Sequence, residues 1–289
     1  MKLGVRREKF PEWLHRSLPA ASGESVRRVI IGQRLNTVCE EARCPNRSEC
    51  YSRQTATFMI LGKVCTRHCS FCGVLSGIPE DVSADEPDRI AIAVQSLHLR
   101  YVVITSVTRD DLADEGAGQF SRVIWTLKKL IPGIQVEVLT PDFHAREELI
   151  AMIVKEKPMV YGHNVETVPR LQPKVRPQAS FTQSLRVLEV VKNVASHMIT
   201  KSGIMLGLGE TLAEVRSSAR ELRSVGCDIL TVGQYLKPCH ASAEVVRYVP
   251  PGVFRDLAEE LKGFGFQKVE AGPFVRSSYH AEKVFWQRN

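Results

Sequence analysis

The chain lacks the long apolar run of a membrane helix and the apolar core of a secretory signal. No stretch of its 289 residues approaches the ~20 apolar residues that span a bilayer. The N-terminus, MKLGVRREKFPEW, is basic but carries no export segment. We therefore expect a cytoplasmic protein without a membrane partner, and eight cysteines without an export signal suggest a reducing compartment and metal binding.

Signatures of nucleic-acid binding are also missing. The chain shows no aromatic RNA-binding motif, no basic low-complexity tail and no helix-turn-helix pattern. The net charge is nevertheless +7, from 39 basic and 32 acidic side chains. A charge of this size suits an ordinary solvated surface, and it also suits an acidic partner. We expect no nucleic-acid partner.

Six of the eight cysteines fall in two groups of three. The second group, Cys65, Cys69 and Cys72, follows an apolar run at 55–62 that predicts a buried strand closed by glycine. These thiols then lie on the loop at the C-terminal end of a strand, where α/β proteins carry out their chemistry. An iron–sulfur cluster normally takes four protein ligands. Three thiolates leave one iron open to a substrate.

A zinc site is the alternative for these three thiols. Structural zinc takes four ligands, and His68 could serve as the fourth. Disulfides are disfavoured in a chain without an export signal. The first group, Cys39, Cys44 and Cys50, is also one ligand short. Because six thiolates exceed what one zinc ion or one cluster needs, the pattern favours two clusters.

The two remaining cysteines have simpler explanations. Cys227 precedes a predicted strand, and we expect it to act as a small buried hydrophobe. Cys239 and His240 could form a ligand pair, but a loop thiol is the simpler interpretation.

Apolar segments alternate with amphipathic helices in the rest of the chain. Six βα units predict a parallel sheet with right-handed crossovers, and a complete barrel of eight would take about 250 residues. We expect a partial (β/α)6 TIM-type barrel, with an open doubly wound sheet as the alternative. The predicted strands are 55–62, 101–107, 135–141, 159–164, 199–207 and 228–236.

The barrel is expected at 55–250. An N-terminal extension at 1–54 would carry the first cysteine group, and a C-terminal extension at 251–289 would cover it. Leu212, Val215, Ala219, Leu222 and Val225 recur at helical spacing and predict one buried helix face.

Trp125 lies on another amphipathic helix, and we expect it in the core.

Polar residues follow the C-terminal ends of five predicted strands. Any one set could consist of helix caps and turns, but five sets on one rim indicate a site. These sets lie at 105–117, 140–142, 163–167, 201–211 and 234–236.

Several motifs of the chain resemble those of a known family. Cys-x3-Cys-x2-Cys after the first strand is typical of the radical S-adenosylmethionine superfamily, and further motifs resemble the lipoyl synthase family. The likeness runs from about residue 11 to 280. The matching segments are TVCEEARCPNRSEC at 37–50, ATFMILG at 56–62, HNVETVPRL at 163–171, TKSGIMLGLGET at 200–211 and RSSYH at 276–280.

One departure is visible. The family usually has His-x-Pro shortly after the Gly-Gln-Tyr-Leu-x-Pro motif. Here the histidine follows Pro238 early and the second proline is absent, which changes the local loop geometry.

The resemblance implies an enzyme, a sulfurtransferase that inserts two sulfur atoms at C6 and C8 of a protein-bound octanoyl chain. Its cofactors would be S-adenosylmethionine and two 4Fe–4S clusters, of which the auxiliary one donates sulfur. Its partners would be octanoylated lipoyl carrier domains, found in the acyltransferase subunits of 2-oxoacid dehydrogenases and in the glycine cleavage H protein. An electron donor such as ferredoxin or flavodoxin is also implied.

The resemblance also implies roles for individual residues. Cys65, Cys69 and Cys72 would hold the reducing cluster. Cys39, Cys44, Cys50 and Ser278 would hold the auxiliary one. The candidates for binding S-adenosylmethionine are Thr105, Ser106, Asn164, Glu166, Lys201, Gln234, Tyr235 and Leu236.

The positive charge leads us to expect a basic face for an acidic carrier. Candidate residues are Arg170, Lys174 and Arg176, any of which could instead serve an internal site.

Three other functions remain open at this point. A methylthiotransferase would usually have an additional RNA-binding domain, and the sequence shows no recognisable one. An electron carrier of ferredoxin type would need no βα units, and a zinc-stabilised binding protein would hold no iron.

Overall fold

One curved sheet organises the molecule, a computed structural model that describes residues 10–15, 23–53, 55–279 and 281. Its eight strands lie in the order β1-β2-β5-β6-β7-β8-β9-β10. The strands are β1 (Asn36–Thr37), β2 (Thr57–Ile60), β5 (Tyr101–Ser106), β6 (Gln135–Leu139), β7 (Val160–Gly162), β8 (Ile199–Leu206), β9 (Ile229–Gln234) and β10 (Lys268–Gly272). A separate parallel pair joins β3 (Val64–Cys65) to β4 (Leu75–Ser76).

All strands from β2 to β10 in this sheet run parallel, and β1 pairs antiparallel with β2. The six predicted strands are therefore confirmed. Two strands of this sheet were not predicted, β1 at one edge and β10 at the other, and neither was the separate pair of β3 and β4. Among the described residues β1 pairs only with β2 and β10 only with β9, so the sheet is an open, partial barrel.

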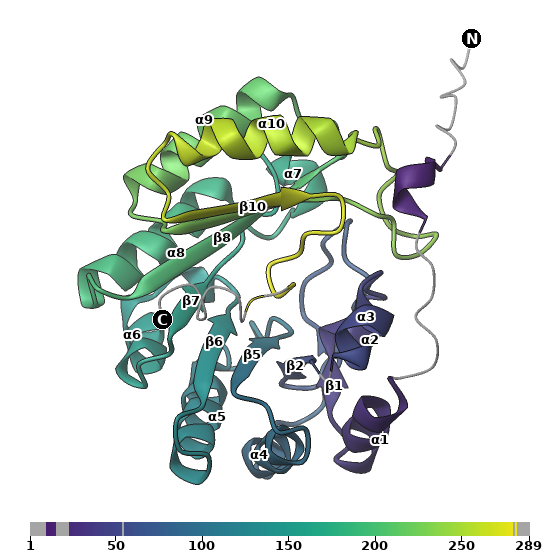
Figure 1. The fold of residues 1–289 in the computed structure, drawn as a ribbon. Coiled ribbons are helices and arrows are strands. Elements are labelled where there is room, and N and C mark those ends of the chain that lie inside the picture. The colour runs from purple at the N-terminus through teal and green to yellow at the C-terminus, as the bar shows by residue number, and fades with distance from the viewer. Residues whose placement is uncertain (1–9, 16–22, 54, 280, 282–289) are drawn as a thin grey trace.

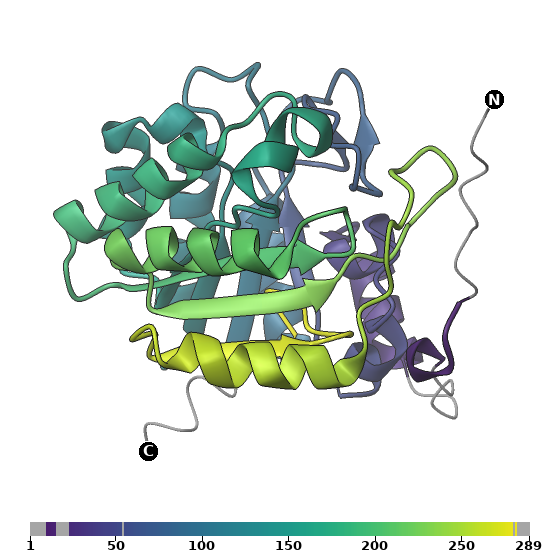
Figure 2. The same ribbon diagram turned by 90° about the horizontal axis from the view of Figure 1, so that it is seen from above.

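Helices cover the outer face of the sheet, and the C-terminal segment after β10 enters its concave side (Figure 1, Figure 2). The helices are α1 (Glu24–Gly32), α2 (Val38–Glu41), α3 (Arg47–Ser52), α4 (Glu86–Ser96), α5 (Ala117–Leu130), α6 (Glu147–Lys155), α7 (Gln172–Val175), α8 (Phe181–Val194), α9 (Leu212–Ser224) and α10 (Pro251–Lys262). Short 3-10 helices are η1 (Glu12–Leu14), η2 (Phe143–Ala145) and η3 (Pro169–Leu171).

The predicted face of α9 is confirmed at its centre. Val215, Ala219 and Leu222 are fully buried in the core. Thr211 and Glu214 form a reciprocal capping box that starts this helix.

The core position predicted for Trp125 is wrong, since the side chain is 52% exposed. Phe120, Val123, Ile124 and Leu127 occupy the buried face of α5 instead. Trp125 lies on the outer side, where the Lys129 ammonium sits 4.4 Å from the centre of its ring.

Cys227 is a buried thiol, as predicted, and it donates a hydrogen bond to the Ile229 carbonyl. Cys239 is a loop thiol 3.1 Å from the Ser242 hydroxyl. All eight cysteines are free, so the structure contains no disulfide.

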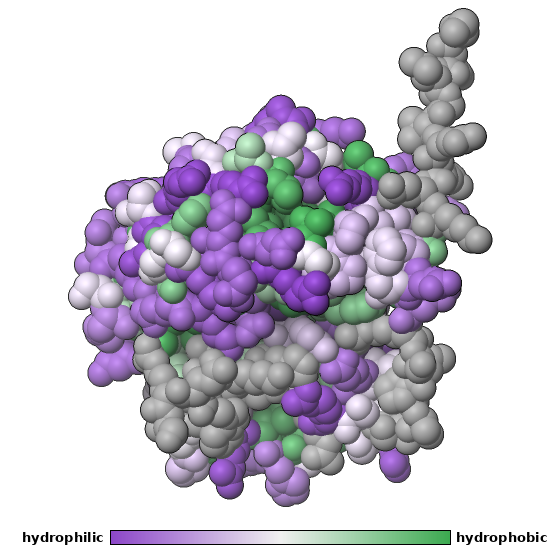
Figure 3. Space-filling model, turned by 45° about the horizontal axis from the view of Figure 1, so that its top comes forward, coloured by the Kyte–Doolittle hydropathy of each residue, from purple (hydrophilic) through white to green (hydrophobic). Residues whose placement is uncertain are grey.

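The surface is predominantly polar on the face that Figure 3 shows, apart from an apolar area near its top. No helix among the described residues is long and apolar enough to cross a bilayer.

Candidate metal centres

The loop after β2 carries the second cysteine group. Cys65 lies in β3, and its sulfur accepts hydrogen bonds from the backbone amides of Arg67 (3.4 Å) and Thr108 (3.3 Å). The sulfur of Cys72 accepts one from Val74 at 3.5 Å. Amide donors aimed at sulfur favour thiolates, the form that binds metal.

The three thiols of this loop lie close enough together for their charges to interact electrostatically. Burial raises the pKa of Cys72 to about 12, and the neighbouring Cys69 and Cys65 contribute in the same direction against the Val74 amide. Burial also raises the pKa of Cys69, where the nearby Arg176 opposes the effect. Thiols that lie close together and are shielded from water are costly to ionise on their own. A bound metal ion removes that cost because its positive charge stabilises the thiolates.

Arg67 anchors the cysteine loop to the barrel. Its side chain is only 5% exposed, and it makes a two-pronged ion pair with Asp142 at 2.7 and 2.9 Å. It also donates to Asp110 at 2.7 and 2.8 Å. Burial alone would raise the pKa of Asp142, but the hydrogen bonds and charge of Arg67 outweigh it and hold the pKa at about 2.

Glu166 and Asn164, two of the predicted residues, lie on the segment after β7. Glu166 contributes to the raised pKa of both Cys69 and Cys72, so its carboxyl group is a close neighbour of these thiols. Burial raises the pKa of Glu166 itself, and the nearby Arg176 opposes this. An acid and a guanidinium thus lie beside the thiols.

His163 lies on the same segment but does not face the thiols. Its ring nitrogens bond the Thr140 carbonyl (2.9 Å) and the Ser184 hydroxyl (3.0 Å). Burial, with a further contribution from Arg176, lowers its pKa to about 4. The side chain is therefore neutral at pH 7.

The predicted rim residues of β5 differ in their bonding. The Thr105 hydroxyl donates to the Leu139 carbonyl at 2.7 Å. The buried Ser106 hydroxyl has no hydrogen-bond partner among the described residues. A buried hydroxyl without a partner is costly, so Ser106 suits a polar ligand.

The rim residues of β8 and β9 bond within the protein. Lys201 forms a buried ion pair with Glu137 at 2.8 Å. The Gln234 amide nitrogen donates to three backbone carbonyls, and its oxygen accepts from the Val249 amide. The Tyr235 hydroxyl donates to the Ala243 carbonyl at 2.7 Å. Leu236, which follows β9, is partly buried.

The first cysteine group sits beside the barrel on α2 and α3. Thr37 caps α2, on which Cys39 is buried, and Cys50 lies on α3. Burial raises the pKa of Cys39 to about 12; the Thr57 amide opposes this, while Cys44 and Cys50 add to it. These three thiols therefore also form one group.

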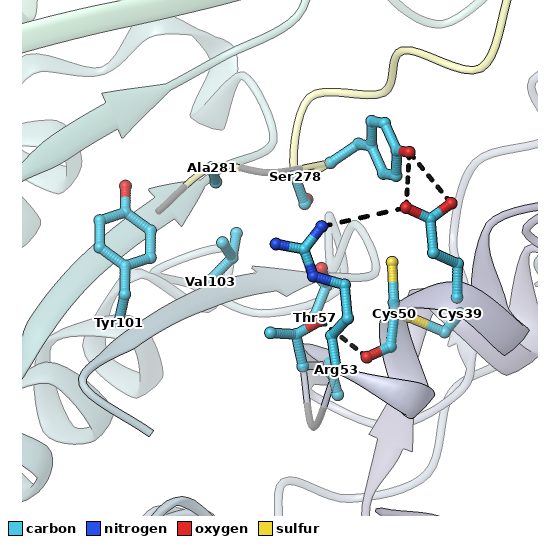
Figure 4. Close-up of a pocket in the computed structure, with 12 residues that line it drawn as sticks. Cys39, Cys50, Arg53, Thr57, Tyr101, Val103, Ser278 and Ala281 are labelled. Carbon is cyan, nitrogen blue, oxygen red and sulfur yellow. Dashed lines mark hydrogen bonds and ion pairs between the residues drawn. The ribbon is translucent and has the colours of Figure 1, made fainter. Parts of the chain in front are cut away.

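The C-terminal segment folds over this group. The Asn46 side chain donates to the Phe274 carbonyl at 2.7 Å, and the Tyr279 hydroxyl donates to Glu49 at 2.8 Å. Cys39, Cys50 and Ser278 line one pocket, and Figure 4 shows Ser278 opposite the two cysteines. Ser277 instead donates to Asn164 at 2.9 Å. His280 lies outside the described residues.

The two cysteine groups are neighbours. A Cβ atom added to Gly73, next to Cys72, would lie 3.3 Å from the carbonyl oxygen of Ala42, between Cys39 and Cys44. Glycine allows this close backbone approach. Two incomplete thiol sets, each one ligand short of four, thus meet at the barrel mouth and fit two iron–sulfur clusters.

Comparison with known proteins decides the family. A model of the radical SAM superfamily matches residues 59–222. Lipoyl synthase from Caldanaerobacter subterraneus subsp. tengcongensis is 50% identical over 272 residues, covering 94% of this chain and 95% of the relative. Lipoyl synthase from Caldicellulosiruptor saccharolyticus is 50% identical over 277 residues, covering 96% and 97%. The chain belongs to the lipoyl synthase family.

A member of the lipoyl synthase family is a radical S-adenosylmethionine sulfurtransferase that makes the lipoyl cofactor, with S-adenosylmethionine and 4Fe–4S clusters as cofactors. The zinc-protein and electron-carrier alternatives are thereby removed. Among solved structures, methylornithine synthase matches with a TM-score of 0.56 at 14% identity, covering 91% of this chain and 82% of that one. That likeness supports the radical SAM fold alone.

The sequence did not reveal the buried Arg67–Asp142 pair of this lipoyl synthase family member. It also did not show whether Arg176 belongs to a basic surface for the carrier or to an internal site. Arg176 is buried and donates to the carbonyls of Asn164 and Val165 at 3.2 Å, so it serves an internal site. Lys174 is exposed.

Proposed function

We propose that the two cysteine groups divide the reaction between them. Cys65, Cys69 and Cys72 hold the cluster that reduces S-adenosylmethionine, and Cys39, Cys44 and Cys50 hold the cluster that donates sulfur. When the clusters and S-adenosylmethionine are bound, they would supply a carbon radical, which removes hydrogen from unactivated C–H bonds. They would also supply the sulfur that takes the place of that hydrogen. The observation that carries the proposal is the close approach of Gly73 to Ala42, which brings the two groups together.

The chain's own part is to fix the two cysteine groups in place and to keep water away from them. Arg67, tied to Asp142, fixes the direction of the second cysteine loop. Asn46 and Tyr279 tie the C-terminal segment over the first group. A covered site protects a reactive carbon centre from solvent and stray hydrogen donors.

Ser278 is the proposed fourth ligand of the auxiliary cluster. Its support is the pocket that Ser278 shares with Cys39 and Cys50. A serine oxygen is a harder ligand than a thiolate, whereas iron–sulfur clusters prefer soft thiolates. A weakly held iron suits a cluster that is consumed as it gives up sulfur.

The S-adenosylmethionine site is proposed at the rim beside the second group. Ser106 has an unused hydroxyl, and Glu166 offers a carboxylate next to the thiols. Asn164, whose side chain accepts from Ser277, links this rim to the C-terminal segment. The remaining rim candidates are Thr105, Lys201, Gln234, Tyr235 and Leu236, whose bonds within the protein position the rim.

The substrate is proposed to be an octanoylated lipoyl carrier domain, of the acyltransferase or H-protein kind. Such carriers are commonly acidic, and the chain's charge of +7 would steer them. Lys174 is exposed near the mouth, and the Ser70 hydroxyl donates to its carbonyl. Arg170 is exposed but already paired with Glu214 at 2.6 Å, which leaves it less free for a partner.

A ferredoxin or flavodoxin is proposed as electron donor, and the cytoplasm as the compartment. The proposed division of the chain is an N-terminal extension at 1–54, a barrel at 55–250 and a C-terminal extension at 251–289. The last part contributes α10 and β10 before it folds over the first cysteine group.

The test is anaerobic purification followed by iron, sulfide and product analysis. Two clusters predict about eight iron and eight sulfide atoms per chain. With S-adenosylmethionine and reductant, mass spectrometry of an octanoylated carrier should show two added sulfur atoms. An unchanged octanoyl chain, with both clusters present and S-adenosylmethionine cleaved, would contradict the proposal.

A further inference from the structure

A third group of metal-ligating side chains lies on the barrel rim, and it contains no cysteine. Asp110 and Glu115 belong to the loop after β5, and His144 belongs to η2 after β6. One ligand atom from each of the three lies within 4.8 Å of the other two. Two loops that follow neighbouring strands thus converge on one point.

Glu115 is the least satisfied member of this group. The residue is only 6% exposed, yet its Oε2 has no hydrogen-bond partner among the described residues. Its Oε1 lies 3.0 Å from His144 Nδ1. A buried carboxylate oxygen without a partner carries a large desolvation cost, and it calls for a cation.

Asp110 retains room for another partner. Its carboxylate accepts from Arg67 through both oxygens and from Thr66 through Oδ2. A carboxylate offers about four lone-pair positions, so these bonds leave one on Oδ1.

The local charge favours a divalent cation. The side chains in this ion-pair network are the guanidiniums of Arg67 and Arg146 and the carboxylates of Asp110, Asp142, Glu115 and Glu148. Four carboxylates against two guanidiniums leave an excess of two negative charges. One divalent ion would neutralise this excess.

We propose that Asp110, Glu115 and His144 bind a divalent first-row transition metal, separate from both cysteine groups. One imidazole and two carboxylates suit ions such as Mn²⁺, Fe²⁺ and Zn²⁺. The 3.0 Å between Glu115 and His144 matches the separation of two ligands that each lie ~2.1 Å from one ion.

The ion would connect this site to the cysteine loop through Arg67. Arg67 donates to Asp110 and lies 3.4 Å from His144 Nε2. A metal here ties the loops after β5 and β6 together, and so supports the side chains that anchor the second cysteine group.

The test uses the gel-filtered holoenzyme and Mn²⁺ alone, followed by the loss of the free-ion EPR signal. Mn²⁺ prefers oxygen and nitrogen ligands and competes poorly for the cysteine sites. Wild type should bind one Mn²⁺ per chain, and Zn²⁺ should displace it. Binding should weaken at least about tenfold in His144→Ala and in Glu115→Gln. His197→Ala, an exposed histidine before β8, should bind as wild type does.

Glu115→Gln keeps the shape of the side chain and one acceptor oxygen, and it removes the charge. A variant with normal cluster absorbance but weakened Mn²⁺ binding therefore supports a metal site rather than a purely structural role. Absence of Mn²⁺ binding to wild type at millimolar concentration would overturn the proposal. Equal binding by wild type, His144→Ala and Glu115→Gln would overturn it as well.

Discussion

Asp142→Asn should loosen the cysteine loop by removing the buried partner of Arg67. Asp142 is fully buried at its side chain, and Arg67 is 5% exposed. The amide keeps the size of the side chain and loses its charge. Arg67 would then keep only Asp110, a more exposed carboxylate.

The pKa of Asp142 gives the size of the expected loss of stability. It falls from 3.8 to about 2, and one unit corresponds to about 1.4 kcal/mol, so ionised Asp142 stabilises the fold by about 2 kcal/mol. Because the folded-state pKa is depressed, this contribution is present above pH 3.8 and is lost as pH falls through about 2. Breaking a buried pair typically costs about 3–5 kcal/mol, and the remaining Asp110 contact puts the expected loss nearer to 2.

Thermal unfolding of the anaerobic, cluster-loaded protein at pH 7 measures this loss. For a chain of 289 residues a loss of about 2 kcal/mol lowers Tm by about 3 °C. The matched control is Glu189→Gln, which removes the partner of Arg186 in a pair whose side chains are 49% and 46% exposed. An exposed pair contributes at most about 1 kcal/mol, so the control should melt close to wild type. If Asp142→Asn melts no lower than Glu189→Gln, the anchoring role of Arg67 is wrong.

Three further predictions concern the C-terminal serine, the carrier and pH. Ser278→Ala should keep S-adenosylmethionine cleavage but lose most sulfur insertion, whereas Ser277→Ala should keep most of both; equal losses in the two variants, measured by product analysis, would refute the ligand role. Lys174→Glu should weaken binding of an octanoylated carrier several-fold at low salt, and Lys155→Glu, beyond the opposite end of the strands, should not; carrier affinity that does not change with salt argues against steering. The lowered pKa of His163, about 4, means that the folded state resists its protonation. Stability should therefore be full above pH 6.5 and fall towards pH 4, and a His163→Gln variant that falls equally would contradict this assignment.

Much of the fold could be predicted from the sequence, because parallel strands buried on both faces appear as short apolar runs. The six strands from β2 to β9 in the main sheet follow this rule. Strand β1 has two residues, too few to show a pattern. Strand β10, KVEAG, lies at an edge and is mostly partly exposed, so its residues do not form an apolar run.

The cysteine groups could be predicted because their spacing is local, whereas the supporting contacts join residues far apart in the chain. Arg67 and Asp142 are separated by 75 positions, and Asn46 and Phe274 by 228. The only local signal for the first pair was an arginine inside the cysteine loop. Trp125 shows that local patterns can also mislead, since helical periodicity alone did not show which side of α5 this residue occupies.

The central claim is that the two cysteine groups have different tasks, and one paired measurement tests it. Methionine release and lipoyl product should be measured in Cys65→Ala and in Cys44→Ala under the same anaerobic conditions. Cys65→Ala should abolish both, because the reducing electron is lost. Cys44→Ala should release methionine without lipoyl product. Loss of methionine release in Cys44→Ala, with the cluster at Cys65, Cys69 and Cys72 still intact, would contradict the account.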